Sequence, residues 1–254
     1  MRYLFEIELY KILKRKDFWI LNTMIIIPIF YAVGVATHSS IVTYEGTEKS
    51  YGLKYFVDMY SFIYMIFIYF FLLSMSVIRS LRGELENKSI RLYSQRINSR
   101  KKIYLSKNLA MVAAFSFVTL FVAMVSILVY YTLVMQRTDI SEASFIHGDE
   151  LGYLFANFFS VYLFFVWSIF YSFMLSAYLK SGTALGIYAL TVVAGMYIKE
   201  FPYVKFLSPA YYTQRIMDTP QGAIWMLLAM TAVTVFYCLF FYFAGRNRLE
   251  KSDI

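Results

Sequence analysis

The sequence predicts an all-α polytopic membrane protein. Hydrophobic residues make up 60% of the 254 positions and charged residues only 16%. The apolar residues gather in six stretches, and nearly every charge lies between them. A helix rises about 1.5 Å per residue, so about 20 apolar residues cross the ~30 Å of bilayer hydrocarbon. Backbone groups in lipid must pair within the chain, so these stretches are expected to be helices. A soluble globular domain and a disordered chain are both excluded.

The predicted spans occupy 18–37, 56–78, 108–135, 153–179, 183–198 and 223–244. The third is the longest and is expected to tilt or to project beyond the bilayer. The fifth is the shortest. The sequence shows no internal repeat, low-complexity tract or second domain, so residues 1–254 are expected to form a single transmembrane domain.

The distribution of charge predicts the orientation of the chain. With a cytosolic N-terminus, the cytosolic parts hold 18 Lys and Arg against 7 acids, and the outer loops hold 6 against 8. The remaining acid, Asp58, lies inside the second span. Such a basic excess is typical of the cytosolic side. The net charge of +8 therefore reflects topology in the bilayer and not a nucleic-acid partner, and both termini are expected in the cytosol. The cytosolic parts are 1–17, 79–107, 180–182 and 245–254.

Residues 1–17 form a predicted interfacial amphipathic helix. One face of its helical wheel carries charge, and another is apolar. A plain basic flank that only fixes topology is the alternative. The charged face contains Glu8, Lys11, Lys14 and Arg15, and the apolar face contains Phe5, Leu9, Ile12 and Leu13.

Short connections organise the second half of the chain. The turn 180–182 predicts that the fourth and fifth spans are adjacent and antiparallel. Gly182 and Gly186 form a small-xxx-small pair, which serves either intramolecular packing or a dimer face. Three prolines interrupt 199–222, which predicts a short re-entrant or surface-lying segment before the last span.

Catalytic and metal-binding motifs are missing from the sequence. The nearest match to a phosphate-binding Walker A loop, 245–252, has Glu250 where the motif needs glycine. Cys238 is the single cysteine, and the two histidines fall in different outer loops, so no metal site is expected. Asp58, four residues after Lys54, forms either a helical ion pair or part of a substrate pathway. We therefore predict a protein that is not itself an enzyme.

The loop 79–107 carries the most distinctive pattern. It opens with Glu84 and Glu86, continues through an apolar string, and ends strongly basic. Such a segment can dock in a groove of a cytosolic partner, although a solvated basic loop beside anionic lipid would look the same. The apolar string consists of Ile90, Leu92 and Ile97.

The order of these features resembles the coupling loop of type 2 ATP-binding-cassette exporter permeases. The resemblance covers nearly the whole chain: the N-terminal helix, six spans, the Ser208-Pro209-Ala210-Tyr211 segment and the basic tail 245–254. Many members have proline where this chain has Arg96, which puts the local bend of the loop in question.

The resemblance implies that a permease pairs with a second copy or a paralogue, and that each engages a separate cytosolic ATPase subunit. ATP and Mg would bind that subunit, and this chain would hold no cofactor. The N-terminal helix would brace the same surface. The residues implied to make first contact with the ATPase are Glu84, Glu86, Lys88, Arg91, Arg96 and Arg100.

Cargo is suggested by the aromatic content, with Phe, Tyr and Trp at 20% of residues. Tyrosine suits a pathway for amphiphilic cargo, although aromatic belts and core packing use it equally. Asn22, Asp58 and Asn157 are the candidate pathway residues. The chain resembles permeases that export peptides from Gram-positive bacteria, including phenol-soluble modulin toxins and antimicrobial peptides, which implies a bacterial plasma membrane. Polysaccharide, drug or lipid export stays open, as do an ion-coupled secondary transporter, a stand-alone channel and a membrane scaffold.

Overall fold

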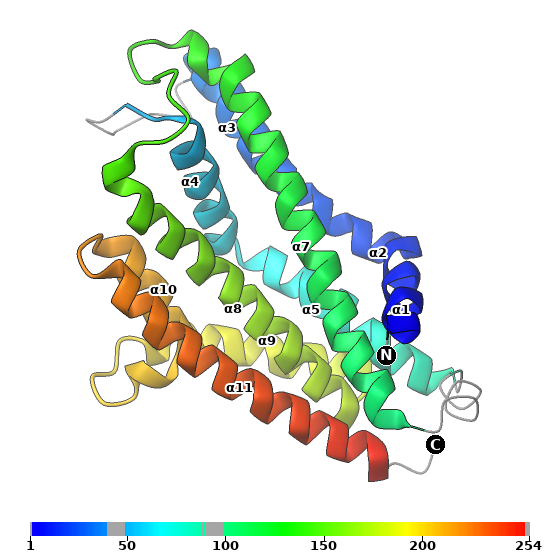
Figure 1. The fold of residues 1–254 in the computed structure, drawn as a ribbon. Helices are drawn as coiled ribbons and strands as arrows, with labels where there is room; N and C mark the ends of the chain where they lie inside the picture. Colours follow the sequence, from blue (N-terminus) through cyan, green and yellow to red (C-terminus); the bar gives the residue numbers. More distant parts are fainter. Residues whose placement is uncertain (1, 40–48, 88, 90–98, 252–254) are drawn as a thin grey trace.

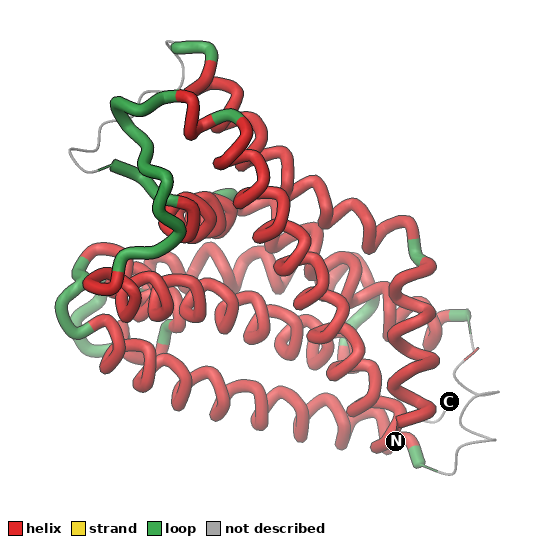
Figure 2. The backbone as a smooth tube through the Cα atoms, turned by 45° about the horizontal axis from the view of Figure 1, so that its top comes forward, coloured by secondary structure: helices red, strands yellow, loops and turns green. Residues whose placement is uncertain are grey.

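The computed structural model describes residues 2–39, 49–87, 89 and 99–251, and within them all regular structure is helical (Figure 1). The longer helices form one bundle, and the connecting loops gather at its two ends (Figure 2). In chain order the elements are α1 (Arg2–Lys14), α2 (Lys16–Trp19), η1 (Ile20–Ile25), α3 (Ile26–Ala36), α4 (Gly52–Met65), α5 (Phe67–Glu86), α7 (Arg100–Thr132), η2 (Val134–Gln136), η3 (Gly148–Glu150), α8 (Leu151–Tyr178), α9 (Ser181–Ile198), η4 (Lys205–Leu207), α10 (Pro209–Asp218) and α11 (Ala223–Lys251).

Five continuous helical segments are long and apolar enough to cross a bilayer, and a sixth candidate is the bent pair α4 and α5. The chain is therefore a membrane protein of helical spans, as the composition predicts. The five segments are Lys16–Ala36, Arg100–Gln136, Gly148–Tyr178, Ser181–Ile198 and Ala223–Lys251.

The second predicted span, 56–78, is not one straight helix. It bends by 75° between α4 and α5, where Ile66 takes an extended conformation (φ −86°, ψ 99°). Neither proline nor glycine lies near this position. Instead, Tyr64 before the bend and Phe70 after it both pack edge-on against Phe164 of α8, with ring centroids 5.2 Å away. This aromatic packing across the bend stabilises the change in direction.

The predicted loop 79–107 is shorter in the structure, because helix enters it from both sides. α5 continues to Glu86, and α7 begins at Arg100 instead of Asn108. Buried side chains at Ile103, Tyr104 and Lys107 explain the early start of α7, since they need a regular helix to reach the core. α7 has 33 residues and is therefore about 50 Å long.

α8 lies at the centre of the bundle. It packs against α4, α5, α9, α10 and α11, whereas α3 packs on α7 (Figure 1). Aromatic rings fill much of the core around it. Phe165 of α8 stacks on Phe70 of α5 at 4.7 Å, and also contacts Phe115 of α7 at 5.0 Å. The sequence analysis left open whether the aromatic residues serve cargo or packing. Many of them pack against one another in this core.

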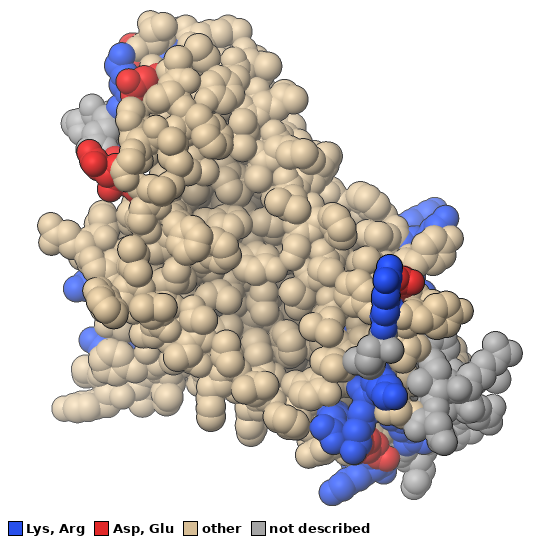
Figure 3. Space-filling model, viewed as in Figure 1, with Lys and Arg blue, Asp and Glu red and all other residues tan. Residues whose placement is uncertain are grey.

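The charges separate toward the two ends of the bundle. On the face drawn in Figure 3, Lys and Arg gather where α1, the start of α7 and the end of α11 lie, and the opposite end carries acids together with some Lys and Arg. We call these the basic end and the far end. Regions that the sequence analysis assigns to the cytosol, 1–17, the start of α7 and the end of α11, thus meet at one end.

Loops close the far end of the bundle. The Tyr130 hydroxyl donates to the carbonyl of Ser50 at 2.6 Å, and the Ser50 amide donates to the carbonyl of Ile140 at 2.9 Å. Arg137 binds Asp139 through two hydrogen bonds and holds the pKa of that carboxyl at about 2. The segment 199–222 contains the short helix α10, which begins at Pro209. Proline suits the first position of a helix, because the backbone N–H that it lacks would have no partner within the helix there.

Candidate functional site

A cluster of four charged side chains, two of them buried, lies at the basic end, beside the loop between α5 and α7. We call it the ion cluster: Glu8 and Lys11 of α1, Glu84 of α5 and Lys107 of α7. The Lys107 ammonium is 2.6 Å from Glu8 and 2.9 Å from Glu84. Lys11 is 3.2 Å from each of the same two carboxylates. Positive and negative groups therefore alternate around a closed ring.

Burial makes this ring unlike an ordinary surface network. The side chains of Lys107 and Glu8 are 2% and 3% exposed, and Glu84 is 23% exposed. Lys107 also donates to the carbonyl of Ser80 at 3.3 Å. Charges removed from water are costly unless they are paired and hydrogen-bonded, so each member depends on the others. The ion cluster thereby fastens α1 to both helices that flank the loop.

The buried face of α1 differs from the one that its helical wheel predicts. Its most buried residues are Leu4, Glu8 and Ile12, one helical turn apart along a single stripe. The sequence analysis placed Glu8 on the charged face and Ile12 on the apolar face, whereas in the structure both lie on the buried stripe, where Lys107 pairs with Glu8. α1 is amphipathic, but it packs its carboxylate inward against α7.

A second set of contacts joins the start of α7 to the end of α11. The Arg100 guanidinium donates to the carbonyls of Leu249 and Glu250 at 3.3 and 3.4 Å, a favourable place for a cation because a helix C-terminus carries partial negative charge. Lys101 lies 3.6 Å from the Glu250 carboxylate. α11 can approach α7 this closely only with glycine at position 245, since a Cβ there would overlap the hydroxyl of Tyr104 in α7.

The end of α5 is also tied to the turn between α8 and α9. Glu86 accepts a hydrogen bond from Arg82 at 3.1 Å and one from the hydroxyl of Ser181, the first residue of α9, at 3.4 Å. Both ends of the loop are thus anchored: one at α1 and α9, the other at α1 and α11. Of the six residues implied to contact an ATPase, the structure places Glu84, Glu86 and Arg100 in these anchors. Lys88, Arg91 and Arg96 lie outside the described residues.

The three candidate pathway residues do not form one cluster. Asn157 is 2% exposed and accepts a hydrogen bond from Ser61 of α4 at 3.2 Å, so it joins α4 to α8 inside the core. Asn22 donates to the carbonyl of Trp19 within its own helical segment. Asp58 lines a separate small pocket at the far end, beside Tyr55. Lys54, considered as a partner for Asp58, binds Glu150 at 3.3 Å.

Sequence reasoning missed Lys107, Glu8 and Lys11 as site residues. A signal for Lys107 exists: if the helix starts at Arg100, Lys107 shares a face with Tyr104, Asn108 and Met111, all buried. A lysine on that face must have a buried anion. Nothing in the sequence identifies Glu8 as that anion.

Comparison with known proteins adds no assignment. No family model matches this sequence, and no curated protein matches it. Among the described residues, no three His, Cys, Asp or Glu side chains lie close enough together to hold a metal ion. The described residues at the basic end thus show a loop between α5 and α7 whose two ends are fastened to three other helices, α1, α9 and α11.

Proposed function

We propose that this chain is the membrane-spanning permease subunit of an ATP-driven exporter, powered by a separate cytosolic ATPase. The observation that carries the proposal is the ion cluster. It couples α1, α5 and α7 beside the loop that resembles a coupling loop. A force applied to that loop by an ATPase would move α5 and α7 together, because a shared buried lysine links them. The bend at Ile66 would then turn movement of α5 into a change of angle against α4.

On this proposal the loop faces the cytosol of a bacterium, ATP and Mg bind the partner, and the cargo is an amphiphile, with peptide toxins or antimicrobial peptides as the best candidates. Of the two candidate acids in the loop, Glu86 is the more available to the ATPase, with 45% of its side chain exposed against 23% for Glu84. Glu84 instead acts through Lys107 and Lys11, which already bind it.

The first test is purification of the chain from native membranes in mild detergent. We expect a soluble protein bearing a Walker A motif to accompany it in equal amount, with ATP hydrolysis in the preparation. The matched control is a chain in which residues 89–98 are replaced by Gly and Ser. That chain should insert in the membrane and lose the partner. A native chain that arrives alone and without ATPase activity would favour a channel, a scaffold or a secondary transporter.

The second copy of the permease has a suitable surface on α9. Gly182 and Gly186 lie on an exposed stripe that continues through Leu190, Val193 and Tyr197. A Cβ added at either glycine meets no atom within 4 Å in the single chain. Small residues on a lipid-exposed stripe allow two helices to approach closely. We propose that this stripe contributes to the dimer.

Gly186→Leu is expected to weaken dimerisation at least about tenfold, a change of ~1.4 kcal/mol, and to leave the fold of each subunit intact. Light scattering in detergent would measure the dimer, and a thermal unfolding curve would measure the subunit. Gly245→Ala is the contrasting variant: its added Cβ meets Tyr104, so it should lower the unfolding temperature. If Gly186→Leu leaves the dimer unchanged, α9 does not form the interface.

A further inference from the structure

Two neighbouring pockets near the far end of α9 have complementary chemistry. The larger has a volume of about 430 Å³ and lies between α8, α9 and α11, next to the segment 204–210. The smaller, about 150 Å³, is polar and lies on α10 and the end of α9. The two pockets adjoin, because neighbouring residues of the chain line one and the other. Ile198 and Ala210 line the larger pocket, and Lys199 and Tyr211, which follow them in sequence, line the smaller.

The walls of the larger pocket, which we call the tail pocket, offer almost no hydrogen bonds. The Tyr171 hydroxyl pairs with Thr191 at 2.8 Å, and the Ser208 hydroxyl donates to the Gly195 carbonyl at 3.0 Å. Tyr237 donates to the carbonyl of Leu207 at 3.0 Å. Water needs two to four polar partners, and apolar cavities of ~150 Å³ already stay dry and bind small hydrocarbons. The tail pocket is lined mainly by apolar and aromatic side chains, so its lining suits an apolar occupant.

The tail pocket reaches the surface of the molecule beside apolar residues of the segment 199–222. Val204 and Leu207, two of its lining residues, are 41% and 61% exposed. Trp167, another lining residue, is only 7% exposed, and its indole N–H has no hydrogen-bond partner among the described residues. Val204 and Trp167 thus line one pocket, which connects an exposed apolar position to a buried one.

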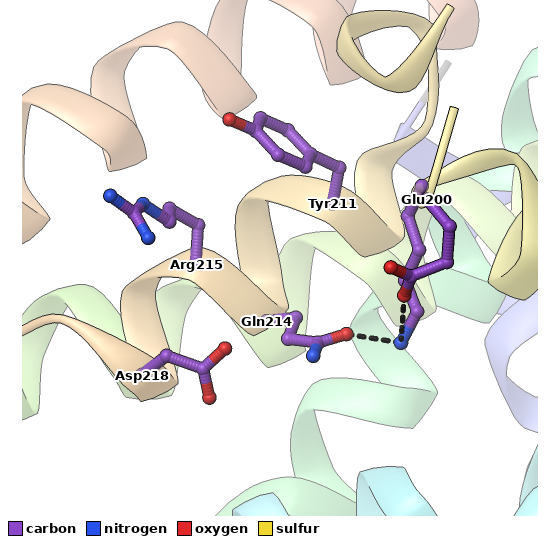
Figure 4. Close-up of a pocket in the computed structure, with 6 residues that line it drawn as sticks. Glu200, Tyr211, Gln214, Arg215 and Asp218 are labelled. Atoms are coloured by element: carbon purple, nitrogen blue, oxygen red, sulfur yellow. Dashed lines mark hydrogen bonds and ion pairs between the residues drawn. The ribbon is translucent and has the colours of Figure 1, made fainter. Parts of the chain in front are cut away.

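The smaller pocket, which we call the head pocket, is lined by charged and amide side chains (Figure 4). Lys199 hydrogen-bonds Gln214 and lies 4.0 Å from Glu200. Arg215 and Asp218 extend from the same side of α10 in Figure 4, and Arg215 has no ion-pair partner among the described residues. A guanidinium with free donors suits a phosphate. The two carboxylates suit a headgroup that carries hydroxyl or amine donors.

A third cation lies next to the head pocket. The Lys205 ammonium sits 5.2 Å from the centre of the Tyr211 ring and 5.3 Å from that of Phe206. Lysine, tyrosine and arginine together are typical of the headgroup level of a bilayer. α9 has 18 residues, so its end lies about 27 Å from its start at the basic end. The head pocket is thus one bilayer thickness away from the basic end.

We propose that these two pockets form one binding site for a phospholipid of the outer leaflet. Its phosphate would bind Arg215 and Lys199, hydroxyl or amine groups of its headgroup would bind Glu200 and Asp218, and one acyl chain would fill the tail pocket against Trp167. This site requires only that the chain spans a bilayer with its basic end on the cytosolic side. It stands whether or not an ATPase partner exists.

Fluorescence quenching tests the tail pocket. In a chain carrying Trp19→Phe and Trp225→Phe, Trp167 is the single tryptophan. In bilayers of phosphatidylglycerol with brominated acyl chains, we expect its fluorescence to be quenched by at least half, although it is shielded from bulk lipid. Gly195→Leu should relieve the quenching by filling the tail pocket. Ala194→Leu, which adds the same side chain on the exposed side of α9, should not.

Lipid titration in detergent tests the head pocket. Arg215→Gln should weaken quenching by brominated phosphatidylglycerol and by brominated phosphatidylcholine about tenfold, because both lipids carry the phosphate that Arg215 is proposed to bind. Asp218→Asn should weaken quenching by phosphatidylglycerol alone, because the phosphatidylcholine headgroup has no hydrogen-bond donors for a carboxylate. Absence of quenching, equal effects of Gly195→Leu and Ala194→Leu, or an Arg215→Gln variant with unchanged affinity would each overturn the site. Displacement of the brominated lipid by an amphipathic peptide at stoichiometric concentration would assign the site to peptide instead.

Discussion

Lys107→Met is expected to destabilise the protein by about 3–5 kcal/mol, which is the usual cost of removing one partner from a buried ion pair. Methionine has a similar length, so the loss is one of charge and not of volume. The carboxylates of Glu8 and Glu84 would face each other with only the half-exposed Lys11 to compensate. For a chain of this size the unfolding temperature in detergent should fall by about 10 °C.

Two variants separate this effect from a general sensitivity of the basic end. Arg2→Met removes an exposed ion pair with Glu6, whose side chains are 93% and 55% exposed, and should cost less than about 1 kcal/mol. The double variant Glu8→Met with Lys107→Met removes both members of the tightest pair, and should recover part of the lost stability. If Lys107→Met is as stable as Arg2→Met, the ion cluster does not fasten α1 to the bundle.

The helical membrane fold follows from the sequence because its cause is local. A run of about 20 apolar residues has to be helical in lipid wherever it packs. The turn at 180–182 likewise predicts that α8 and α9 are adjacent, and the structure confirms it. No long helix crosses the proline-containing segment 199–222, as expected, although Pro209 begins the short helix α10 within it.

The bend at Ile66 could not be predicted in this way. Sequence-based reasoning finds kinks through proline or glycine, and neither is present. The bend is associated with contacts that Tyr64 and Phe70 make with Phe164, about a hundred residues further along the chain. Packing over such a distance leaves no periodic signal.

The ion cluster shows the same limit at the candidate site. Glu84 was identified because it opens a recognisable loop, but its partners come from two other helices. Glu8 and Lys107 are 99 positions apart and meet only in the folded chain. A helical wheel assigns a carboxylate to the solvent by default, since it contains no information about a cation on another helix. The sequence can show that Lys107 needs an anion, and only the fold identifies which one.

Reversing charge in the loop, with Arg91→Glu and Arg96→Glu together, is expected to reduce cargo transport at least about tenfold and to leave membrane insertion intact. The change replaces two positive charges by two negative ones in the segment that the proposal assigns to the ATPase interface. Reversing a charge that faces a complementary partner turns attraction into repulsion and costs several kcal/mol of interaction free energy. The tenfold loss of transport corresponds to only ~1.4 kcal/mol, which is less than this cost. ATP hydrolysis should persist without transport.

The matched control is Arg248→Glu with Lys251→Glu. It makes the same change in net charge at the same end of the molecule, on exposed positions of α11. Transport by this control should stay within about twofold of the native chain, and both double variants should appear in the membrane in equal amount. The ion cluster predicts a further distinction: Lys107→Met should impair both stability and transport, whereas the loop variant should impair transport alone. Normal transport by the loop variant would remove the coupling role from this loop, because the anchors at Glu84, Glu86 and Arg100 would then only stabilise the fold.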